Sequence, residues 1–434
     1  MKMDDKSETG FLIEENKRLR KAIEELSVLN EIATAISSTL SLTEIIDLIV
    51  WKCIKHLNVE QAAVMLLDEN RPDDKLQTMI RKADTKTDGF VPLRLDSQIT
   101  GWILKNRKPL LVKKVSSDKR FNNLLLKTSE IKSFLSVPML SKGGIIGIIT
   151  VFNKKDDGEF TEEDQKLLSI IAAQSTQTIV NARLLEEEKK LLQLRQELKT
   201  AAEIQKNILP QKIPKVHGYE ISAVNIPAKE VGGDYYDFVL RNECELIFCL
   251  GDITGKGIPA AMLMANLQAT FRSQAQIHKS LSDIIFSSNT LLHKSTEVDK
   301  YATLFAGIVD YKNHTLTYCN AGHNNPVKIS AQGEIIKLSK GGIILGFMDA
   351  FPFDEETLQL DAGDLIVVYS DGITETMNEK GEEYGEERLM ELLIDNFELS
   401  PSELISKIIG ETEKHAMSEP QSDDKTLLIL RRVK

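Results

Sequence analysis

The chain has 434 residues, 42% of them hydrophobic, which is enough for two or three domains with sizeable cores. Its 65 acidic and 54 basic residues give a net charge of −11, which argues against nucleic acid as a main partner. The four cysteines form no CxxC pair and the seven histidines show no ligand spacing, so a zinc site or disulfide framework is disfavoured and a cytoplasmic location is predicted. The N-terminus does not look like a signal peptide, and no apolar run approaches the roughly 18–20 residues of a membrane span.

Residues 1–40 are predicted to contain a charged N-terminal helix. Its apolar residues form one narrow stripe, made of Leu12, Leu19, Ile23 and Leu26. A stripe of this kind is typical of a helix that packs against a partner helix.

Residues 41–185 indicate one α/β domain. A helix is predicted over 42–57, and a short helix opens at Gly101. Apolar runs that indicate strands lie at 62–67, 76–80, 134–140 and 143–152. Thr161 is expected to cap a further helix, with Asp164 as its acidic third residue.

This pattern resembles a GAF domain in its SVPM segment, the glycine turn before GIIGIITVFN and the FTEEDQKLL helix start. Four residues partly match the NK…F…DE signature of cyclic-nucleotide-binding GAF domains: Asn153, Lys154, Phe160 and Asp164. Gln165, however, replaces the final Glu of that signature. A Lys–Asp pair that closes a strand–helix turn explains the same residues structurally. A domain for dimerisation, or for an unknown small ligand, is therefore favoured over nucleotide binding.

Residues 186–210 are predicted to form a coiled-coil linker helix. Two sets of residues recur at intervals of seven: Leu184, Leu191, Leu198 and Gln205, and beside them Leu194, Ala201 and Ile208. This seam favours a parallel coiled coil or a helix docked on a domain, and a solvated linker helix is the alternative. We therefore expect a homodimer formed through the GAF domain and the helices. Pro210 ends the helix.

Residues 211–434 alternate apolar runs with short turns. Strands are predicted in YEISAVNIPA, ELIFCLGDI, ATLFAGIVDY, TLTYCNAG, PVKIS, LIVVYSDG and TLLILRR. Helices are predicted over 258–274, 281–295, 386–396 and 401–417. Strands outnumber helices, which favours an antiparallel β-sandwich with helices outside. The whole chain is thus predicted to be an α+β multidomain protein.

Four aspartates in this region lie at the edges of candidate strands. They are Asp234 in GGDYYD, Asp252 in CLGDITGKG, Asp371 in YSDGITE and Asp423 in SDDKTLL. Each one alone is also explained as a turn residue or an edge charge. Four together, three of them beside a glycine, point to a shared site. Carboxylate oxygens suit Mg²⁺ or Mn²⁺, and two such ions can activate a water and neutralise a phosphate.

The motifs GGDYYDF, GDITGKGIPAAMLMA, NAGHNNP, YSDGITE and DDKTLLIL resemble, in order and spacing, the metal-dependent, type 2C-like (PPM) protein phosphatases of the bacterial SpoIIE/RsbU branch. The resemblance implies a β-sandwich flanked by helices and a centre of two Mn²⁺ or Mg²⁺ ions. It implies hydrolysis of phosphoserine or phosphothreonine on a partner protein, a phosphorylated anti-sigma-factor antagonist of the STAS type. It also implies that the linker helix docks on the catalytic domain and passes on a dimer-dependent signal.

Carried over motif by motif, the resemblance assigns a role to each aspartate. Asp252 would bridge the two ions, and Asp371 and Asp423 would complete the ligand set of one of them. Asp234 and the backbone carbonyl of Ile253 would serve the other. The resemblance makes Asp252 and Asp371 the expected catalytic residues.

Two nearby residues leave alternatives open. Asp424 competes with Asp423 for the same role. His323 in NAGHNNP fits a general acid, or a structural residue of a tight loop, which is favoured. No arginine in the motifs is identified as a phosphate clamp.

The main prediction is a cytoplasmic, dimeric, GAF-regulated serine/threonine phosphatase. A two-metal phosphodiesterase is a second interpretation, but the histidine ligands typical of that class are missing. A signalling scaffold with an inactive phosphatase fold is a third, and the presence of all four aspartates argues against it.

Overall fold

The computed structural model describes residues 15–16, 41–67, 76–82, 97–118, 131–142, 144–155, 158–296 and 300–433. The chain divides into two compact units, Met1–Leu192 and Gln193–Lys434. Of the helix predicted within 1–40, only residues 15–16 are described, and they are helical. Within the described ranges, no helix is both long and apolar enough to cross a membrane.

The first unit is built on a five-stranded antiparallel sheet. Its order is β2 (Leu76–Lys82), β1 (Val59–Leu67), β5 (Gly144–Lys154), β4 (Phe134–Ser141) and β3 (Leu110–Val112). Helix α2 (Leu42–Leu57) begins at a capping box formed by Ser41 and Glu44, and it packs with the start of α4 (Glu162–Ile208) in one core.

A second core lies against α3 (Ser97–Asn106), which supplies Ile99 and Ile103. This helix begins before Gly101, where the sequence pattern predicts its start. A 3₁₀ turn, η1 (Val115–Ser117), follows β3.

The residues of the nucleotide-binding signature hold the turn from β5 to α4 together. Lys154 Nζ lies 2.5 Å from Asp164 Oδ1, and Phe160 is buried. The Oδ1 of Asn153 accepts the Lys132 N–H at 2.8 Å. Asp164 also accepts the Thr161 N–H at 2.9 Å, as expected at a helix start. The Lys–Asp pair that the structural explanation of this motif predicts is therefore present at the turn.

Helix α4 is a single helix of 47 residues. The two helices that the sequence predicts here are continuous, since neither glycine nor proline interrupts 162–208, and the predicted domain boundary at 185/186 falls inside the helix. In this chain the side chains of Leu184, Leu191 and Leu194 are 58%, 58% and 49% exposed.

The second unit contains two sheets. One has the order β13 (Gly341–Gly342), β10 (Thr315–Ala321), β9 (Ala302–Asp310), β8 (Glu245–Ile253) and β7 (Tyr235–Leu240), with β14 (Glu356–Gln359) also paired to β10. The other has the order β12 (Ile335–Lys337), β11 (Val327–Ile329), β15 (Leu365–Tyr369), β16 (Lys425–Arg432) and β6 (Tyr219–Ile226). The pairs are antiparallel except β10–β13, which is parallel.

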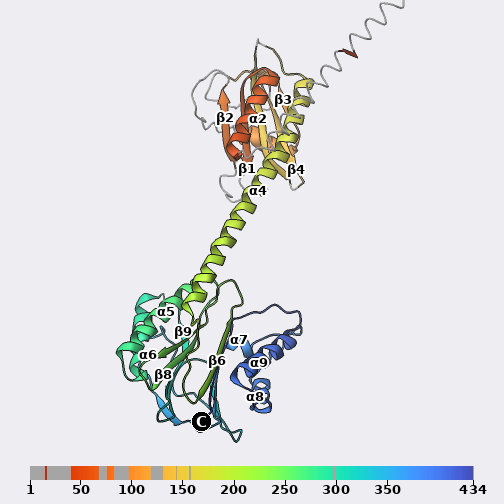
Figure 1. Cartoon of the computed structure of the whole chain (residues 1–434). Helices are drawn as coiled ribbons and strands as arrows, with labels where there is room; N and C mark the ends of the chain where they lie inside the picture. Colours follow the sequence, from red (N-terminus) through yellow and green to blue (C-terminus); the bar gives the residue numbers. More distant parts are fainter. Residues whose placement is uncertain are drawn as a thin grey trace, which may run out of the picture. The chain divides into compact units, whose positions relative to one another are not determined.

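The two sheets pack face to face, with helices on both outer sides. Phe248 and Phe305 of the first sheet share a core with Val368 and Leu428 of the second. Helices α5 (Ile258–Ile277) and α6 (Leu281–Ser295) lie on one side of the sandwich, and α8 (Glu386–Asp395) and α9 (Pro401–Ala416) on the other (Figure 1). The predicted antiparallel β-sandwich flanked by helices is confirmed.

Candidate metal centre

The Asp-Gly pair at 371–372 brings one predicted site residue against another. Strand β15 ends at Tyr369, and Asp371 is the first residue of the short helix α7 (Asp371–Thr374). A Cβ on Gly372 would stand 2.1 Å from the carbonyl oxygen of Asp424, which no side chain tolerates. Glycine therefore lets Asp371 lie beside the 423–424 segment. Burial and the charge of Asp423 raise the pKa of Asp371.

Asp424 holds the loop that carries Asp234. It is 7% exposed, and its carboxylate accepts the backbone N–H groups of Ala228 at 2.7 Å, Gly233 at 2.6 Å and Asp234 at 3.3 Å. A Cβ on Gly232 would stand 2.4 Å from Asp424 Oδ2, so this loop also depends on a glycine. A carboxylate already engaged by three amides has little capacity left for a metal ion.

Asp423 has different surroundings. Its side chain is 32% exposed, and its Oδ2 lies 2.8 Å from Lys256 Nζ. The exposed carboxylate favours Asp423 over Asp424 as a metal ligand.

Asp234 and Asp252 lie next to each other at the end of the first sheet. Asp234, just before β7, is 2% exposed and accepts the Thr426 hydroxyl at 2.5 Å. Burial and the charge of Asp252 raise the pKa of Asp234 well above its usual range. Burial, followed by the charges of Asp371 and Asp423, raises the pKa of Asp252 to about 7. The four predicted aspartates are therefore close enough to act on one another.

Ile253, the fifth predicted ligand, is the last residue of β8, and its side chain packs in the core under α5. Its carbonyl oxygen would stand 3.0 Å from a Cβ on Gly233. The structure thus places this oxygen beside the loop that carries Asp234.

The donor set fits a hard divalent cation by its chemistry and its charge. All four side chains offer carboxylate oxygens, and the raised pKa values of Asp234, Asp252 and Asp371 reflect burial and repulsion that a cation would relieve. As the side chains stand, no three His, Cys, Asp or Glu residues in the described ranges form a ready ligand set for a metal ion. Asp423 in particular is engaged by Lys256.

His323 is held on both sides of its ring. Its Nε2 donates to the carbonyl oxygen of Tyr369 at 3.1 Å, and Nδ1 lies 2.9 Å from the Thr303 hydroxyl. Burial lowers the pKa of His323 to about 4, so the ring is neutral near pH 7. Thr303 lies on β9 and Tyr369 on β15, so the imidazole joins the two sheets. This arrangement supports the structural role rather than the general acid.

Two residues at the centre are not identified from the sequence. Lys256, from the GDITGKG loop, provides the cation beside Asp423. Gln205 donates through Nε2 to the carbonyl oxygen of Gly232 at 2.6 Å and accepts the Gly232 N–H at 3.0 Å. Gln205 therefore contacts the aspartate loop instead of continuing the predicted seam. The sequence contains one signal of this contact, because Gln205 is a polar residue at a heptad core position.

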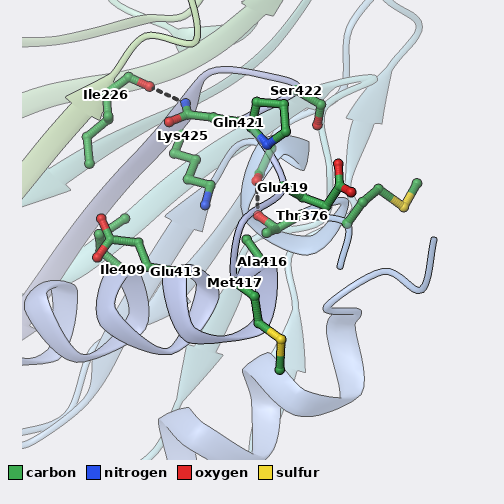
Figure 2. A pocket seen from close by; sticks show the side chains of 13 residues that line it. Ile226, Thr376, Ile409, Glu413, Ala416, Met417, Glu419, Gln421, Ser422 and Lys425 are labelled. Carbon is green, nitrogen blue, oxygen red and sulfur yellow. Dashed lines mark hydrogen bonds between the residues drawn. The ribbon is translucent and has the colours of Figure 1, made fainter. Parts of the chain in front are cut away.

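A pocket of about 150 Å³ adjoins the centre. It is lined by Gly372 and Ser422, the sequence neighbours of Asp371 and Asp423, and by side chains that Figure 2 shows around α9. Among these, Lys425 donates to the Thr412 hydroxyl at 3.2 Å, and burial lowers the pKa of Lys425.

Two protein families match this chain. Residues 39–180 match the GAF domain, and residues 242–433 match Stage II sporulation protein E (SpoIIE). "Phosphoserine phosphatase RsbU" of Bacillus subtilis (strain 168) is 29% identical over 241 residues, which cover 55% of this chain and 71% of RsbU. "Protein IcfG" of Synechocystis sp. is 29% identical over 265 residues, which cover 55% of this chain and 42% of IcfG.

A solved structure shows the same fold. The SiaA-PP2C domain of Pseudomonas aeruginosa is 20% identical, with a TM-score of 0.50, and the match covers 56% of this chain and 98% of that domain. The chain therefore carries a GAF-type domain followed by a SpoIIE-type domain, and the second has the fold of a solved PP2C domain.

Proposed function

We propose that this chain is a metal-dependent serine/threonine protein phosphatase regulated by its GAF domain. The observation that carries the proposal is the convergence of Asp234, Asp252, Asp371 and Asp423 from both sheets of the sandwich. Burial and mutual charge raise the pKa of the first three. Such a group of carboxylates is costly to hold together unless cations bind it.

Each residue has an assigned task in this proposal. Asp252 would help to hold both of two Mn²⁺ or Mg²⁺ ions, Asp371 and Asp423 would help to hold one of them, and Asp234 with the Ile253 carbonyl would help to hold the other. When bound, two such ions supply an activated water and charge that offsets the phosphoryl oxygens. The protein's own contribution is to hold these ligands in a rigid frame.

Support for that frame comes from residues around the ligands. The Thr426 hydroxyl donates to Asp234, and Asp424 fixes the loop before it. His323 fixes the spacing between β9 and β15 at this end of the sandwich. Cys249 and Cys319 are unsuited to act as nucleophiles, because burial raises the pKa of both thiols, that of Cys319 to about 12.

For the substrate, we propose a phosphoserine or phosphothreonine of a STAS-type anti-sigma-factor antagonist. The match to the SpoIIE family and to a relative named as a phosphoserine phosphatase supports this choice. We also propose a homodimer, because the leucines of the predicted seam are exposed in the single chain.

The test is phosphate release from a panel of serine-phosphorylated STAS proteins by the full chain, with Mn²⁺ and with a chelator. We expect turnover only with the metal, and a loss of several orders of magnitude in Asp252→Asn and Asp371→Asn with the fold intact. Asp395→Asn, at the last residue of α8, is the matched control and retains turnover.

Two further readouts separate the alternatives. Direct attack by water leaves no phosphoenzyme, so ¹⁸O from solvent enters phosphate in one step and acid quench traps no phosphorylated chain. Hydrolysis of a phosphodiester in place of the phosphoprotein would identify the phosphodiesterase. Metal binding with no hydrolysis of either substrate would identify the scaffold.

A further inference from the structure

Lys256 lies in the loop between β8 and α5, and its amino group reaches the aspartates. Nζ stands 2.8 Å from Asp423 Oδ2 and donates to the carbonyl oxygen of Ser422 at 2.7 Å. The side chain is 43% exposed. The flanking residues Gly255 and Gly257 have φ of +97° and +76°, and no atom lies within 4 Å of a Cβ built on either. The loop around Lys256 is therefore loosely packed, with its amino group held at the centre.

The charge of Lys256 interacts with several aspartates of the centre. Its hydrogen bond to Asp423, with the nearby charges of Asp424 and Asp371, raises the pKa of Lys256. In return, its charge acts on Asp371 to lower the pKa of that carboxyl, against the larger effect of burial. The lysine thus supplies part of the positive charge that a divalent ion would supply in full.

We propose that Lys256 substitutes for a metal ion at Asp423 in the metal-free protein and contacts the phosphoryl oxygens of the substrate once the metal is bound. This inference rests on the proposed phosphatase function. A divalent ion competes with a single ammonium group for the same carboxylate, and it neutralises the negative charge that holds the lysine there. The flexible four-carbon side chain then remains within reach of the place where a phosphate dianion arrives.

Lysine suits this second task. An ammonium group binds phosphate as a point charge, and a hydrogen bond between charged partners is about twice as strong as a neutral one. Lys256 would fill the position for which no arginine clamp is identified in the sequence. The competing explanation is purely structural, with Lys256 tying the β8–α5 loop to the 422–423 segment.

The two explanations predict opposite effects on metal binding. Lys256→Met keeps the apolar part of the side chain and removes the charge. If Lys256 competes with the metal, this variant binds Mn²⁺ more tightly. If Lys256 only ties two segments together, the loss of that tie loosens Asp423, and Mn²⁺ binds more weakly.

The experiment uses the full chain and two measurements. Calorimetry with Mn²⁺ alone is expected to show binding about 2- to 5-fold tighter in Lys256→Met, as loss of one exposed charge pair allows. At saturating Mn²⁺, kcat/KM for the phosphoprotein is expected to fall roughly 10- to 100-fold, as loss of one charged hydrogen bond allows. Lys256→Arg keeps the charge and recovers most of both values.

The control is Lys414→Met, which removes another lysine with a carboxylate partner, Glu411 at 2.7 Å on α9. It is expected to match the parent in both measurements. Weaker Mn²⁺ binding in Lys256→Met would overturn the substitution for the metal, and unchanged kcat/KM at saturating Mn²⁺ would overturn the phosphoryl contact. Failure of the proposed function is separate: the parent then binds Mn²⁺ but releases no phosphate, and calorimetry still decides the competition. A parent that binds no Mn²⁺ overturns both.

Discussion

Asp423 and Asp424 are adjacent in the sequence yet differ in their surroundings. Asp424 is 7% exposed and accepts three backbone N–H groups, whereas the Asp423 side chain is 32% exposed, lies beside Lys256 and accepts the N–H of Asp424. One carboxylate therefore organises the loop before Asp234, and the other is available to an ion. Paired aspartates with divided tasks explain why both occur in the DDKTLLIL motif.

The division of tasks predicts opposite results for two isosteric variants. Asp423→Asn is expected to weaken Mn²⁺ binding more than about 10-fold and to leave the free energy of unfolding of the metal-free protein nearly unchanged. Asp424→Asn is expected to lower that free energy by about 1–3 kcal/mol, because an amide is a weaker acceptor than a carboxylate and its NH₂ faces backbone donors. Calorimetry and urea unfolding measure the two effects. Stronger loss of Mn²⁺ binding in Asp424→Asn would reverse the assignment.

The raised pKa values of Asp234 and Asp252 predict a pH dependence of metal binding. With the pKa of Asp252 at about 7, the metal-free centre still holds protons near neutrality, and a cation must displace them. Mn²⁺ affinity is therefore expected to rise with pH up to about 7 and then to level off. Calorimetry in buffers of different ionisation enthalpy should show proton release that is smaller in Asp252→Asn. Equal proton release by parent and variant would contradict this account.

The raised pKa of Asp252 also predicts how the free energy of unfolding of the metal-free protein changes with pH. The folded metal-free protein binds the Asp252 proton more tightly than the unfolded chain, whose pKa keeps its ordinary value. The contribution of this group to the free energy of unfolding therefore falls as pH rises from about 4 to about 7, and it is constant above that range. Added Mn²⁺ is expected to remove this fall.

At the scale of residues, the sequence predicts those site residues that lie at the ends of strands. Asp252 and Asp371 stand out because a run of apolar residues ends in Asp with a glycine nearby, and the structure places them together. The role of Lys256 and the loop-holding role of Asp424 do not stand out, because their partners are distant in sequence: Lys256 donates to Ser422, 166 residues away, and Asp424 accepts from Gly233, 191 residues away. Contacts of that kind depend on how the two sheets pack.

At the scale of elements, the period of apolar residues predicts most helices and strands of the second unit. Strand β7 is an exception, because its centre is Asp237, which is fully buried. The charge is tolerated because Arg272 of α5 makes a two-point contact with it, at 2.5 Å and 2.9 Å, and the Tyr235 hydroxyl donates at 2.8 Å. A strand that depends on a helix 35 residues away is not visible in its own pattern.

The ion pair between α5 and β7 predicts a large cost when only one partner is removed. Arg272→Met leaves Asp237 buried without its cation, and we expect a loss of about 2–4 kcal/mol in the free energy of unfolding, since Arg272 itself is partly exposed. In Arg272→Met with Asp237→Asn no unpaired charge remains, so the loss is expected to be smaller. Urea unfolding of the parent, both single variants and the double variant measures the coupling. Additive losses would show that the contact does not hold α5 in place.

At the scale of the whole molecule, α4 contributes residues to both compact units. Up to Leu192 it belongs to the first unit, where Ile171 and Ile179 join the core. From Gln193 onward it belongs to the second, where Ile208 packs against the core under α5 and Gln205 contacts Gly232. One helix therefore carries the seam leucines and the contact to the aspartate loop. A signal along it depends on which side of the helix each set faces.

The last prediction tests whether the relative orientation of the seam leucines and Gln205 around α4 affects regulation. Inserting two residues after Lys199 rotates Gln205 by about 200° relative to Leu191 and Leu194, at roughly 100° per residue, whereas inserting seven nearly restores the facing. We expect the two-residue insertion to uncouple the phosphatase from the GAF domain and the seven-residue insertion to preserve the coupling. The measurement is the activity of each full-length protein relative to the 193–434 fragment, with the dimer checked by sedimentation. If both insertions behave like the parent, α4 is a passive tether, and the GAF domain must act by direct contact or not at all.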